Sequence, residues 1–289
     1  MQFLVYIVAY PLLWLVSILP FPIFYALSDA IYVLVYHIIG YRKKTVRANL
    51  ALALPNLSDR ERLIIEKKFY HHLCDMFLEM TKTMTMSPEE MSKRFVVTNP
   101  ELIKEYEAKG KSIMLLASHY ASWEWLLTLN TKIAFQGIGV YKKIKNKYFD
   151  KLVRDIRSKY NTQLVVTRDT IPLISNNQRK AVLCMYGLAS DQSPKITRVT
   201  HWDTFMGIEV PVHTGAEVLA KKYDLPILFA KIEKVKRGYY KATFIPLSND
   251  PKSVPNFEIT HQFIQEVEKQ IYEAPEYYFW THKRWKHKR

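Results

Sequence analysis

The sequence predicts an α/β domain, built on a central, mostly parallel or mixed sheet flanked by helices and preceded by N-terminal membrane helices. Two observations support this fold class. Short apolar runs of strand length alternate with longer segments in which apolar residues recur at helical spacing. The first 40 residues are different, because Asp29 is the only charged side chain among them. Water is therefore a poor solvent for that segment.

The N-terminal segment contains two apolar runs. The first extends from Phe3 to Leu19, close to the minimum length for crossing a bilayer, and the second from Ile23 to Ile39. Pro20-Phe21-Pro22 separates them, so we expect two helices joined by a proline turn rather than one long span. A signal peptide would begin with basic residues and end at a small-residue cleavage site, and neither is present. We expect residues 1–40 to be a retained membrane anchor, and a buried hairpin of a soluble core is the alternative.

Basic side chains outnumber acidic ones in the chain as a whole. The 42 Lys and Arg exceed the 27 Asp and Glu by a net charge of +15, which favours anionic partners such as phospholipid head groups or a phosphorylated substrate. Nucleic acid would also suit this charge, but the sequence contains no recognisable nucleic-acid-binding motif. Arg42-Lys43-Lys44 follows the second apolar run, so the positive-inside rule puts residues 41–289, taken as one domain, in the cytoplasm.

The elements of this domain can be predicted in order. Apolar residues at helical spacing indicate an amphipathic helix from Ser58 to about Thr83. Asn99-Pro100-Glu101 is typical of a helix start and Gly110 of a helix end. The apolar segment Ser112–Ala117 is expected to be a strand that ends just before His119. Further strands are expected at 138–141, 164–167, 181–185, 227–232 and 240–245, with helices near 122–134, 147–160, 214–224 and 257–273.

His119 and Glu124 form the pair of residues with the clearest chemical potential. They are five residues apart, so on one continuous helix they would point roughly 140° away from each other. They can meet if the chain bends where the strand ends at Ser118 and a helix begins after Ser122 as its cap. Glu124 would then accept the Nδ1 proton of His119, which leaves Nε2 free to act as a base.

A His-acid pair without a nucleophile of its own suits direct group transfer. The base takes the proton from a substrate hydroxyl, which then attacks an acyl thioester, and such base catalysis typically contributes about 10² to 10⁴ in rate. The spacing also occurs by chance, so an incidental His119 is the alternative interpretation. Its position between a strand and a helix, behind an apolar anchor, favours the catalytic one.

A series of motifs in a fixed order leads to a family. They are Leu19-Pro20-Phe21-Pro22, the stretch Tyr41 to Leu50, Leu54-Pro55, His119 to Glu124, Val140 to Asn146, Asp191-Gln192, Phe205-Met206-Gly207, Thr214-Gly215 and Pro275 to Lys286. Nearly from end to end, the chain resembles the bacterial lipid A biosynthesis acyltransferases, the late or secondary acyltransferases of the lysophospholipid acyltransferase superfamily. The segment from His119 to Glu124 matches the family's His-x-x-x-x-Asp/Glu motif in its Glu form.

The resemblance implies a glycerolipid acyltransferase-like fold and a function in lipopolysaccharide biosynthesis at the bacterial inner membrane. His119 would be the catalytic base and Glu124 its partner. The block from Lys142 to Asn146, together with Arg157, would form the acyl-donor and phosphate side of the cleft. The family usually has Arg where this chain has Lys142, which replaces a bidentate contact by a point charge. The donor would be a thioester of acyl carrier protein or coenzyme A, the acceptor a hydroxyl of an anionic lipid A precursor, and no metal or organic cofactor would be needed.

Further residues are candidates for binding substrate. Asp191 and Gln192 follow an expected strand, although simple turn chemistry would also explain them, and the polar stretch from Ser190 to His213 is long enough for a binding loop. Arg284 belongs to a basic C-terminal tail with interleaved Trp285, a composition that suits lipid head groups. Capping of a helix would account for Asn146 without any substrate.

Two other functions stay open on the sequence alone. The same chemistry could serve another acceptor, such as a lysophospholipid or an aminolipid. The chain could also be a non-catalytic basic protein that binds membrane surfaces through its anchor and cationic face.

Overall fold

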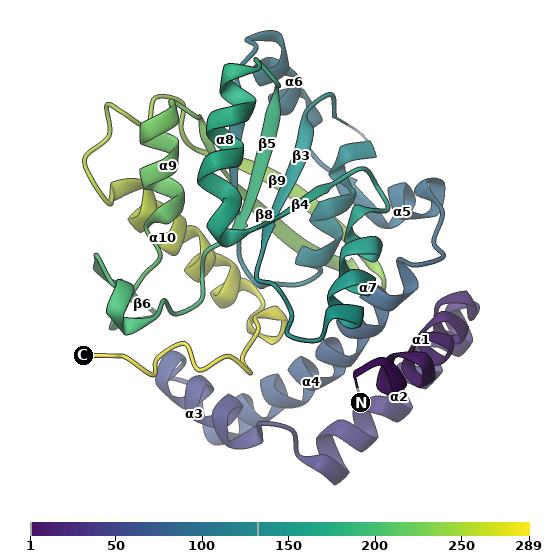
Figure 1. Cartoon of the computed structure of the whole chain (residues 1–289). Coiled ribbons are helices and arrows are strands. Elements are labelled where there is room, and N and C mark those ends of the chain that lie inside the picture. The colour runs from purple at the N-terminus through teal and green to yellow at the C-terminus, as the bar shows by residue number, and fades with distance from the viewer. Residues whose placement is uncertain (1, 132) are drawn as a thin grey trace.

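The computed structural model describes residues 2–131 and 133–289 and contains a seven-stranded sheet in the order β1-β9-β8-β2-β5-β3-β4 (Figure 1). Its strands are β1 Phe95–Val97, β2 Ile113–Ala117, β3 Gln136–Tyr141, β4 Gln163–Val166, β5 Cys184–Ala189, β8 Ile227–Lys236 and β9 Tyr239–Ser248. The five strands from β8 to β4 are parallel. β9 runs antiparallel to β8, and β1 parallel to β9. The predicted fold class is confirmed.

Helices surround this sheet. They are α1 Gln2–Ile18, α2 Phe21–Tyr32, the π-helix η1 Val33–Ile39, α3 Lys43–Ala53, α4 Asp59–Lys82, α5 Pro88–Arg94, α6 Pro100–Ala108, α7 Lys147–Ser158, α8 Thr170–Arg179, α9 Gly215–Tyr223 and α10 Glu258–Glu273. The described residues also contain the 3-10 helices η2 Trp123–Thr131, η3 Thr167–Asp169, η4 Ile196–Arg198 and η5 Pro275–Tyr277. α10 packs against β8 and β9, α9 against β2, and α7 against β4. All five residues of β2 are buried, as expected for a central parallel strand that is covered on both faces.

The N-terminal helices follow the apolar pattern. α1 ends at Ile18 and α2 begins at Phe21 with a proline in its first turn, so the predicted proline turn is confirmed. α2 and η1 together form a continuous helical segment, Phe21–Ile39, of 19 residues, which is long and apolar enough to cross a membrane, while Phe3–Ile18 is shorter. Both α1 and α2 contact α4 (Figure 1).

Local sequence signals account for several boundaries. Ser58 and Glu61 form a reciprocal capping box at the start of α4, which buries Phe69, Leu73 and Met76 as the amphipathic pattern predicts. α6 begins at Pro100 as expected, although the Asn99 side chain bonds to the backbone of Phe244 instead of capping the helix.

Other elements differ from the expectation. The strand expected at 181–185 is β5, which begins only at Cys184, because the unpredicted helix α8 ends at Arg179 and Ala181 turns the chain with a φ of 53°. The expected helix near 122–134 is the 3-10 helix η2. The stretch Ser190–His213 is not a plain loop, since it contains the antiparallel hairpin of β6 Trp202–Phe205 and β7 Ile208–Pro211.

Candidate active site

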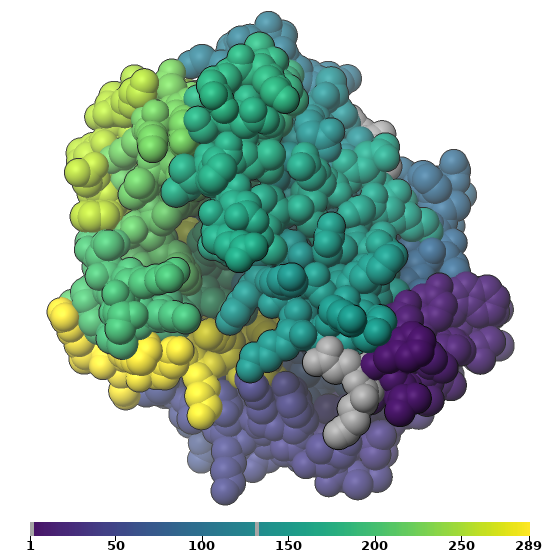
Figure 2. Space-filling model, viewed as in Figure 1, coloured from purple at the N-terminus to yellow at the C-terminus, as the bar shows by residue number. Residues whose placement is uncertain are grey.

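A cavity of about 840 Å³ lies where β2, β3 and β5 end, and His119 is on its wall. The carboxyl ends of parallel strands are where ligands bind in sheets of this type. Figure 2 shows the hollow between α8, α9 and the C-terminal segment. Most of its lining is apolar and includes Leu115, Leu126, Leu127, Leu129, Ile138, Val140, Leu164, Ile171, Met185, Leu188, Val218 and Leu219. The cavity therefore suits an extended hydrocarbon next to a few polar groups.

The chain bends sharply at His119. Tyr120 N donates to Ser118 O at 2.8 Å, and Ala121 has a φ of 48°, a conformation that a residue with a side chain rarely adopts. The C-terminal segment fixes the bend, because Phe279 N donates to His119 O at 3.1 Å. The predicted turn after Ser118 is therefore present, and both His119 and Glu124 line the cavity.

The carboxylate next to His119 is Asp191. His119 Nδ1 lies 2.7 Å from Asp191 Oδ1, and the Asp191 side chain is completely buried. The sequence led us to expect Glu124 in this position, and that expectation is corrected here. Asp191 reaches the imidazole because it follows β5, which pairs directly with β2 in parallel register. Residues that follow two adjacent parallel strands meet at the same edge of the sheet.

Glu124 instead pairs with Arg157 of α7. Arg157 Nε donates to Glu124 Oε2 at 2.8 Å and Arg157 Nη2 to Oε1 at 2.5 Å, which is a bidentate contact. Both side chains line the cavity and are largely shielded from solvent. The pair links η2 to α7 and holds a guanidinium at the cavity wall.

The ionisation of the His119–Asp191 pair is set by mutual attraction. Burial by itself lowers the pKa of His119, but the charge and the hydrogen bond of Asp191 raise it, with a further contribution from Glu124, and the net shift is upward. Burial raises the pKa of Asp191, yet the charge and hydrogen bond of His119 bring it below its usual value. The carboxylate is thus ionised and favours the imidazole tautomer with its proton on Nδ1. Among the described residues, His119 Nε2 has no hydrogen-bond partner.

The other residues predicted to bind substrate are distributed differently. Exposed Lys142 and half-buried Gln192 line the cavity. Asn146 is not among the lining residues, and its side chain accepts from Tyr148 N and Phe149 N at the start of α7, which is the capping role. Arg284, expected to bind substrate from a basic tail, is not among the lining residues either: it is 1% exposed, and its Nη1 donates to Pro211 O at 3.0 Å.

Sequence reasoning named Asp191 and Arg284 but missed Ser193 and His282, which also carry buried polar atoms without a partner among the described residues. Burial lowers the pKa of His282 to about 4, and the charges of Asp191 and Arg284 also act on it. Asp191 Oδ2, Ser193 Oγ, His282 Nε2 and Arg284 Nε and Nη2 are buried, and none of them has a partner among the described residues. The motif from Pro275 to Lys286 was the signal that could have indicated this group, because it carries both His282 and Arg284.

Comparison with known proteins identifies the family. A sequence profile described as bacterial lipid A biosynthesis acyltransferase matches residues 1–287. The chain belongs to this family. The resemblance based on the ordered motifs is therefore confirmed, and this lipid A acyltransferase family member is an O-acyltransferase enzyme.

Individual relatives match most of the length of this chain. A lipid A biosynthesis lauroyltransferase of Escherichia coli (strain K12) is 26% identical over 95% of this chain and 89% of the relative. A lipid A biosynthesis palmitoleoyltransferase of the same strain is 22% identical, over 95% of the chain and 88% of the relative. Lipid A biosynthesis acyltransferase 2 of Shigella flexneri is 21% identical over 83% and 76%, respectively.

Proposed function

We propose that this acyltransferase moves a fatty acyl chain from acyl carrier protein to a hydroxyl of a lipid A precursor, with His119 as the general base. The proposal rests on the position of His119 at the wall of an apolar cavity, where Nδ1 contacts ionised Asp191 and Nε2 has no hydrogen-bond partner among the residues that the structure describes. An imidazole oriented in this way is ready to accept a proton. The membership in the lipid A acyltransferase family supports the same chemistry.

The reaction needs one proton to be moved twice. His119 Nε2 takes the proton of the acceptor hydroxyl while its oxygen attacks the thioester carbonyl. Asp191 stabilises the imidazolium that results, as a buried carboxylate at Nδ1 does in serine hydrolases. When the C–S bond of the tetrahedral intermediate breaks, the departing thiolate takes the proton from His119. The products are the acylated lipid and free carrier thiol, and no covalent enzyme intermediate forms.

Glu124 and Arg157 act together in this proposal. Glu124 binds two nitrogens of Arg157 and so fixes the guanidinium in the cavity wall. An arginine held in this way presents a stable positive charge to a phosphate of the acceptor or to the developing oxyanion. Lys142 adds a second positive charge at the cavity rim.

The apolar depth of the cavity is proposed to hold the acyl chain. Gly139 lies in its wall, and a methyl group added there would come within 2.9 Å of both Leu127 and Leu164. These leucines also line the cavity, so their positions set the room available to the end of the chain. Contact with an extended hydrocarbon contributes about 0.8 kcal/mol for each methylene that is buried.

The N-terminal apolar helices and the basic residues after them support a location at the membrane. We propose that residues 1–40 hold the enzyme at the bacterial inner membrane and that residues 41–289 form the catalytic domain on the cytoplasmic side, where the basic residues after Ile39 meet anionic head groups. An insoluble acceptor and a soluble carrier thioester could both reach a cavity in this position.

Mass spectrometry of lipid A from cells with and without the gene tests the proposal. Expression should add the mass of one acyl chain, which reports acceptor class and donor length together. If the added mass is found instead on lysophospholipids or aminolipids, the proposed lipid A acceptor is wrong, and the assignment of acyl transfer is retained. If His119→Ala protein supports the same acylation, the assignment of His119 as the catalytic base is wrong. A change in lipid A acylation that does not depend on His119 would fit a non-catalytic protein that binds the membrane surface.

A further inference from the structure

Helix α1 is attached to the domain near both of its ends. Near its start, the ring of Phe3 lies 5.1 Å and that of Tyr6 5.6 Å from the ring of Tyr148 in α7. Near its end, Lys82 Nζ of α4 donates to Ser17 O at 2.7 Å. These two sites are about 21 Å apart along the helix, given a rise of about 1.5 Å for each residue. A helix that left the domain to cross a bilayer could not make both contacts.

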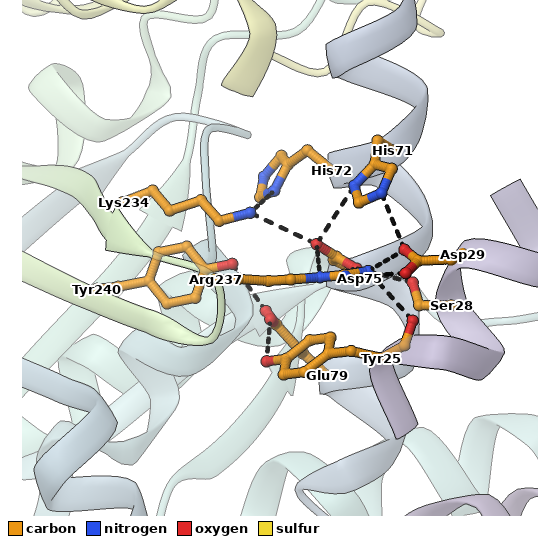
Figure 3. Close-up of polar contacts among 10 residues, drawn as sticks. All are labelled: Tyr25, Ser28, Asp29, His71, His72, Asp75, Glu79, Lys234, Arg237 and Tyr240. Atoms are coloured by element: carbon orange, nitrogen blue, oxygen red, sulfur yellow. Dashed lines mark hydrogen bonds and ion pairs between the residues drawn. The ribbon is translucent and has the colours of Figure 1, made fainter. Parts of the chain in front are cut away.

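Helix α2 is attached through its middle. Its polar side chains enter a group that we call the docking cluster, formed by the ten residues of Figure 3: Tyr25, Ser28, Asp29, His71, His72, Asp75, Glu79, Lys234, Arg237 and Tyr240. Arg237, in the turn between β8 and β9, donates to Asp29 Oδ1 at 2.5 Å and to Asp75 Oδ1 at 2.7 Å. Ser28 Oγ donates to Asp75 Oδ1 at 2.7 Å. The cluster thus joins α2 to α4 and to the β8–β9 hairpin.

The position of Asp29 determines whether the helical segment Phe21–Ile39 can cross a membrane. Asp29 lies near the midpoint of Phe21–Ile39, the segment with the length of a membrane span. If this segment crossed a bilayer with the docking cluster intact, Arg237 and its hairpin turn would lie at the centre of the hydrocarbon. Turns and charged side chains are not tolerated in contact with lipid at that depth. The docking cluster is therefore incompatible with a transmembrane α2.

The outer surface of the two helices remains apolar. Leu4, Val8, Leu12 and Leu15 of α1 recur at helical spacing and are between 51% and 66% exposed. Ile23 and Ile38 continue this surface along α2 and η1. A large exposed apolar surface of this kind on helices marks contact with lipid. Arg42-Lys43-Lys44 follows directly and complements anionic head groups.

We propose that residues 2–39 lie parallel to the membrane in a single leaflet of an anionic bilayer. The docking cluster then faces the domain, and the exposed apolar side chains of α1 and α2 lie in the acyl layer. α1 contacts α7, and the connection just before α7 contributes Lys142 and Ile144 to the cavity lining. The cavity rim is thereby held close to the head groups, where an acceptor lipid can reach it without leaving the membrane. The proposal concerns the attachment and does not depend on the acyl-transfer reaction.

Depth measurements on spin labels test this orientation. Leu4→Cys, Val8→Cys, Leu12→Cys and Leu15→Cys are labelled one at a time in the full chain, bound to vesicles of phosphatidylethanolamine and phosphatidylglycerol. The native Cys74 and Cys184 are buried, and unmodified protein treated with the label is the control. Accessibility to oxygen and to a water-soluble nickel complex gives the depth of each label. We expect all four labels at a similar shallow depth.

A transmembrane α1 gives a different result. Positions 4 and 15 would then differ by about 16 Å along the membrane normal, because the helix rises about 1.5 Å for each residue. A depth gradient of that size, or labels that remain accessible to the nickel complex and not to oxygen, overturns the proposal.

A matched pair of variants tests the docking cluster. Arg237→Met removes the contacts to α2, whereas Lys236→Met removes the neighbouring exposed charge, which has no ion pair to α2 among the described residues. With a spin label at Ile23→Cys, the first variant should increase the mobility of the label and the second should not. Asp29→Asn, at a side chain that is half exposed, repeats the test if Arg237→Met fails to fold. Unchanged mobility in both Arg237→Met and Asp29→Asn overturns the role of the cluster.

Discussion

The active-site cavity and the docking cluster both bury charged groups, but they satisfy them to different extents. In the docking cluster, Tyr25 and Tyr240 each donate to one oxygen of Glu79, and Arg237 binds both oxygens of Asp75. Among the described residues, Asp191, Ser193, His282 and Arg284 carry five buried side-chain atoms without a hydrogen-bond partner, whereas the docking cluster carries one, His72 Nε2. Buried polar groups are normally paired, so an exception calls for a reason. The docking cluster therefore uses its charges to hold three elements together, whereas the residues around Asp191 keep buried polar atoms unpaired next to the candidate base.

The largest effect is expected from removing the base. His119→Ala should lower the rate of acyl transfer by about 10² to 10⁴, because the acceptor hydroxyl loses its proton acceptor. Rates with acyl carrier protein thioester and purified acceptor measure this loss. His287→Ala, outside the cavity lining, is the matched control, and the fraction of protein bound to membranes should stay unchanged in both variants. A fully active His119→Ala protein would show that chemistry takes place elsewhere.

The next effect distinguishes the two carboxylates. Asp191→Asn should also reduce kcat by about 10² or more, because the imidazolium loses its stabilising charge. The same change removes the main influence that raises the pKa of His119, so the residual activity should appear at lower pH than in the original protein. A pH–rate profile from about pH 5 to 9 reveals the shift. An acid limb that moves to higher pH, or stays in place, contradicts the assignment of Asp191.

In the docking cluster, the prediction concerns stability instead of rate. Burial raises the pKa of Glu79 from 4.5 to about 7, so the folded protein holds a proton there that the unfolded chain releases at lower pH. Stability should therefore fall as pH rises from about 4.5 to 7, by at most about 3 kcal/mol for this shift. Glu79→Gln should remove this slope and leave kcat unchanged. Thermal unfolding in detergent across this pH range measures both proteins, and an equally steep slope in the variant would rule out Glu79 as the cause.

A smaller effect is expected at Glu124. Glu124→Gln keeps the size of the side chain and weakens its charge-assisted contacts with Arg157, so Arg157 becomes less well positioned. We expect about a tenfold loss, mainly as a higher KM for the phosphorylated acceptor, which corresponds to one such hydrogen bond. The pH–rate profile should move much less than in Asp191→Asn. If Glu124→Gln shifts the profile more strongly than Asp191→Asn, Glu124 and not Asp191 controls the base.

The smallest effect concerns the length of the acyl chain. Gly139→Ala should push Leu127 or Leu164 into the cavity and so favour a shorter donor. Each methylene that no longer fits changes the preference by about fourfold, which corresponds to about 0.8 kcal/mol. Competition between carrier thioesters of two chain lengths measures the ratio. A preference that stays the same, with normal unfolding, means that the acyl chain does not extend to this wall.

Much of the fold could be predicted because its signals are local. The proline turn between the N-terminal helices, the capping box of α4 and the continuous apolar run of β2 each depend on a few neighbouring residues. α8 was missed because its polar Ser-Asn-Asn-Gln segment lacks a clear helical pattern. The boundary of β5 was wrong for a related reason, since apolar Val182 and Leu183 precede the strand without belonging to it.

The sequence by itself determined the chemical groups and the sharp turn that exposes them: a histidine after a buried strand, a glutamate five residues later, and an apolar N-terminus with a single aspartate. Tertiary structure decided which groups meet. Because β5 lies beside β2 in the sheet, Asp191 contacts His119. The packing of α7 places Arg157 next to Glu124, and the β8–β9 turn places Arg237 next to Asp29. These pairs are 72, 33 and 208 residues apart along the chain. Contacts over such separations depend on how whole helices and strands pack. The spacing of residues within one segment therefore cannot predict them.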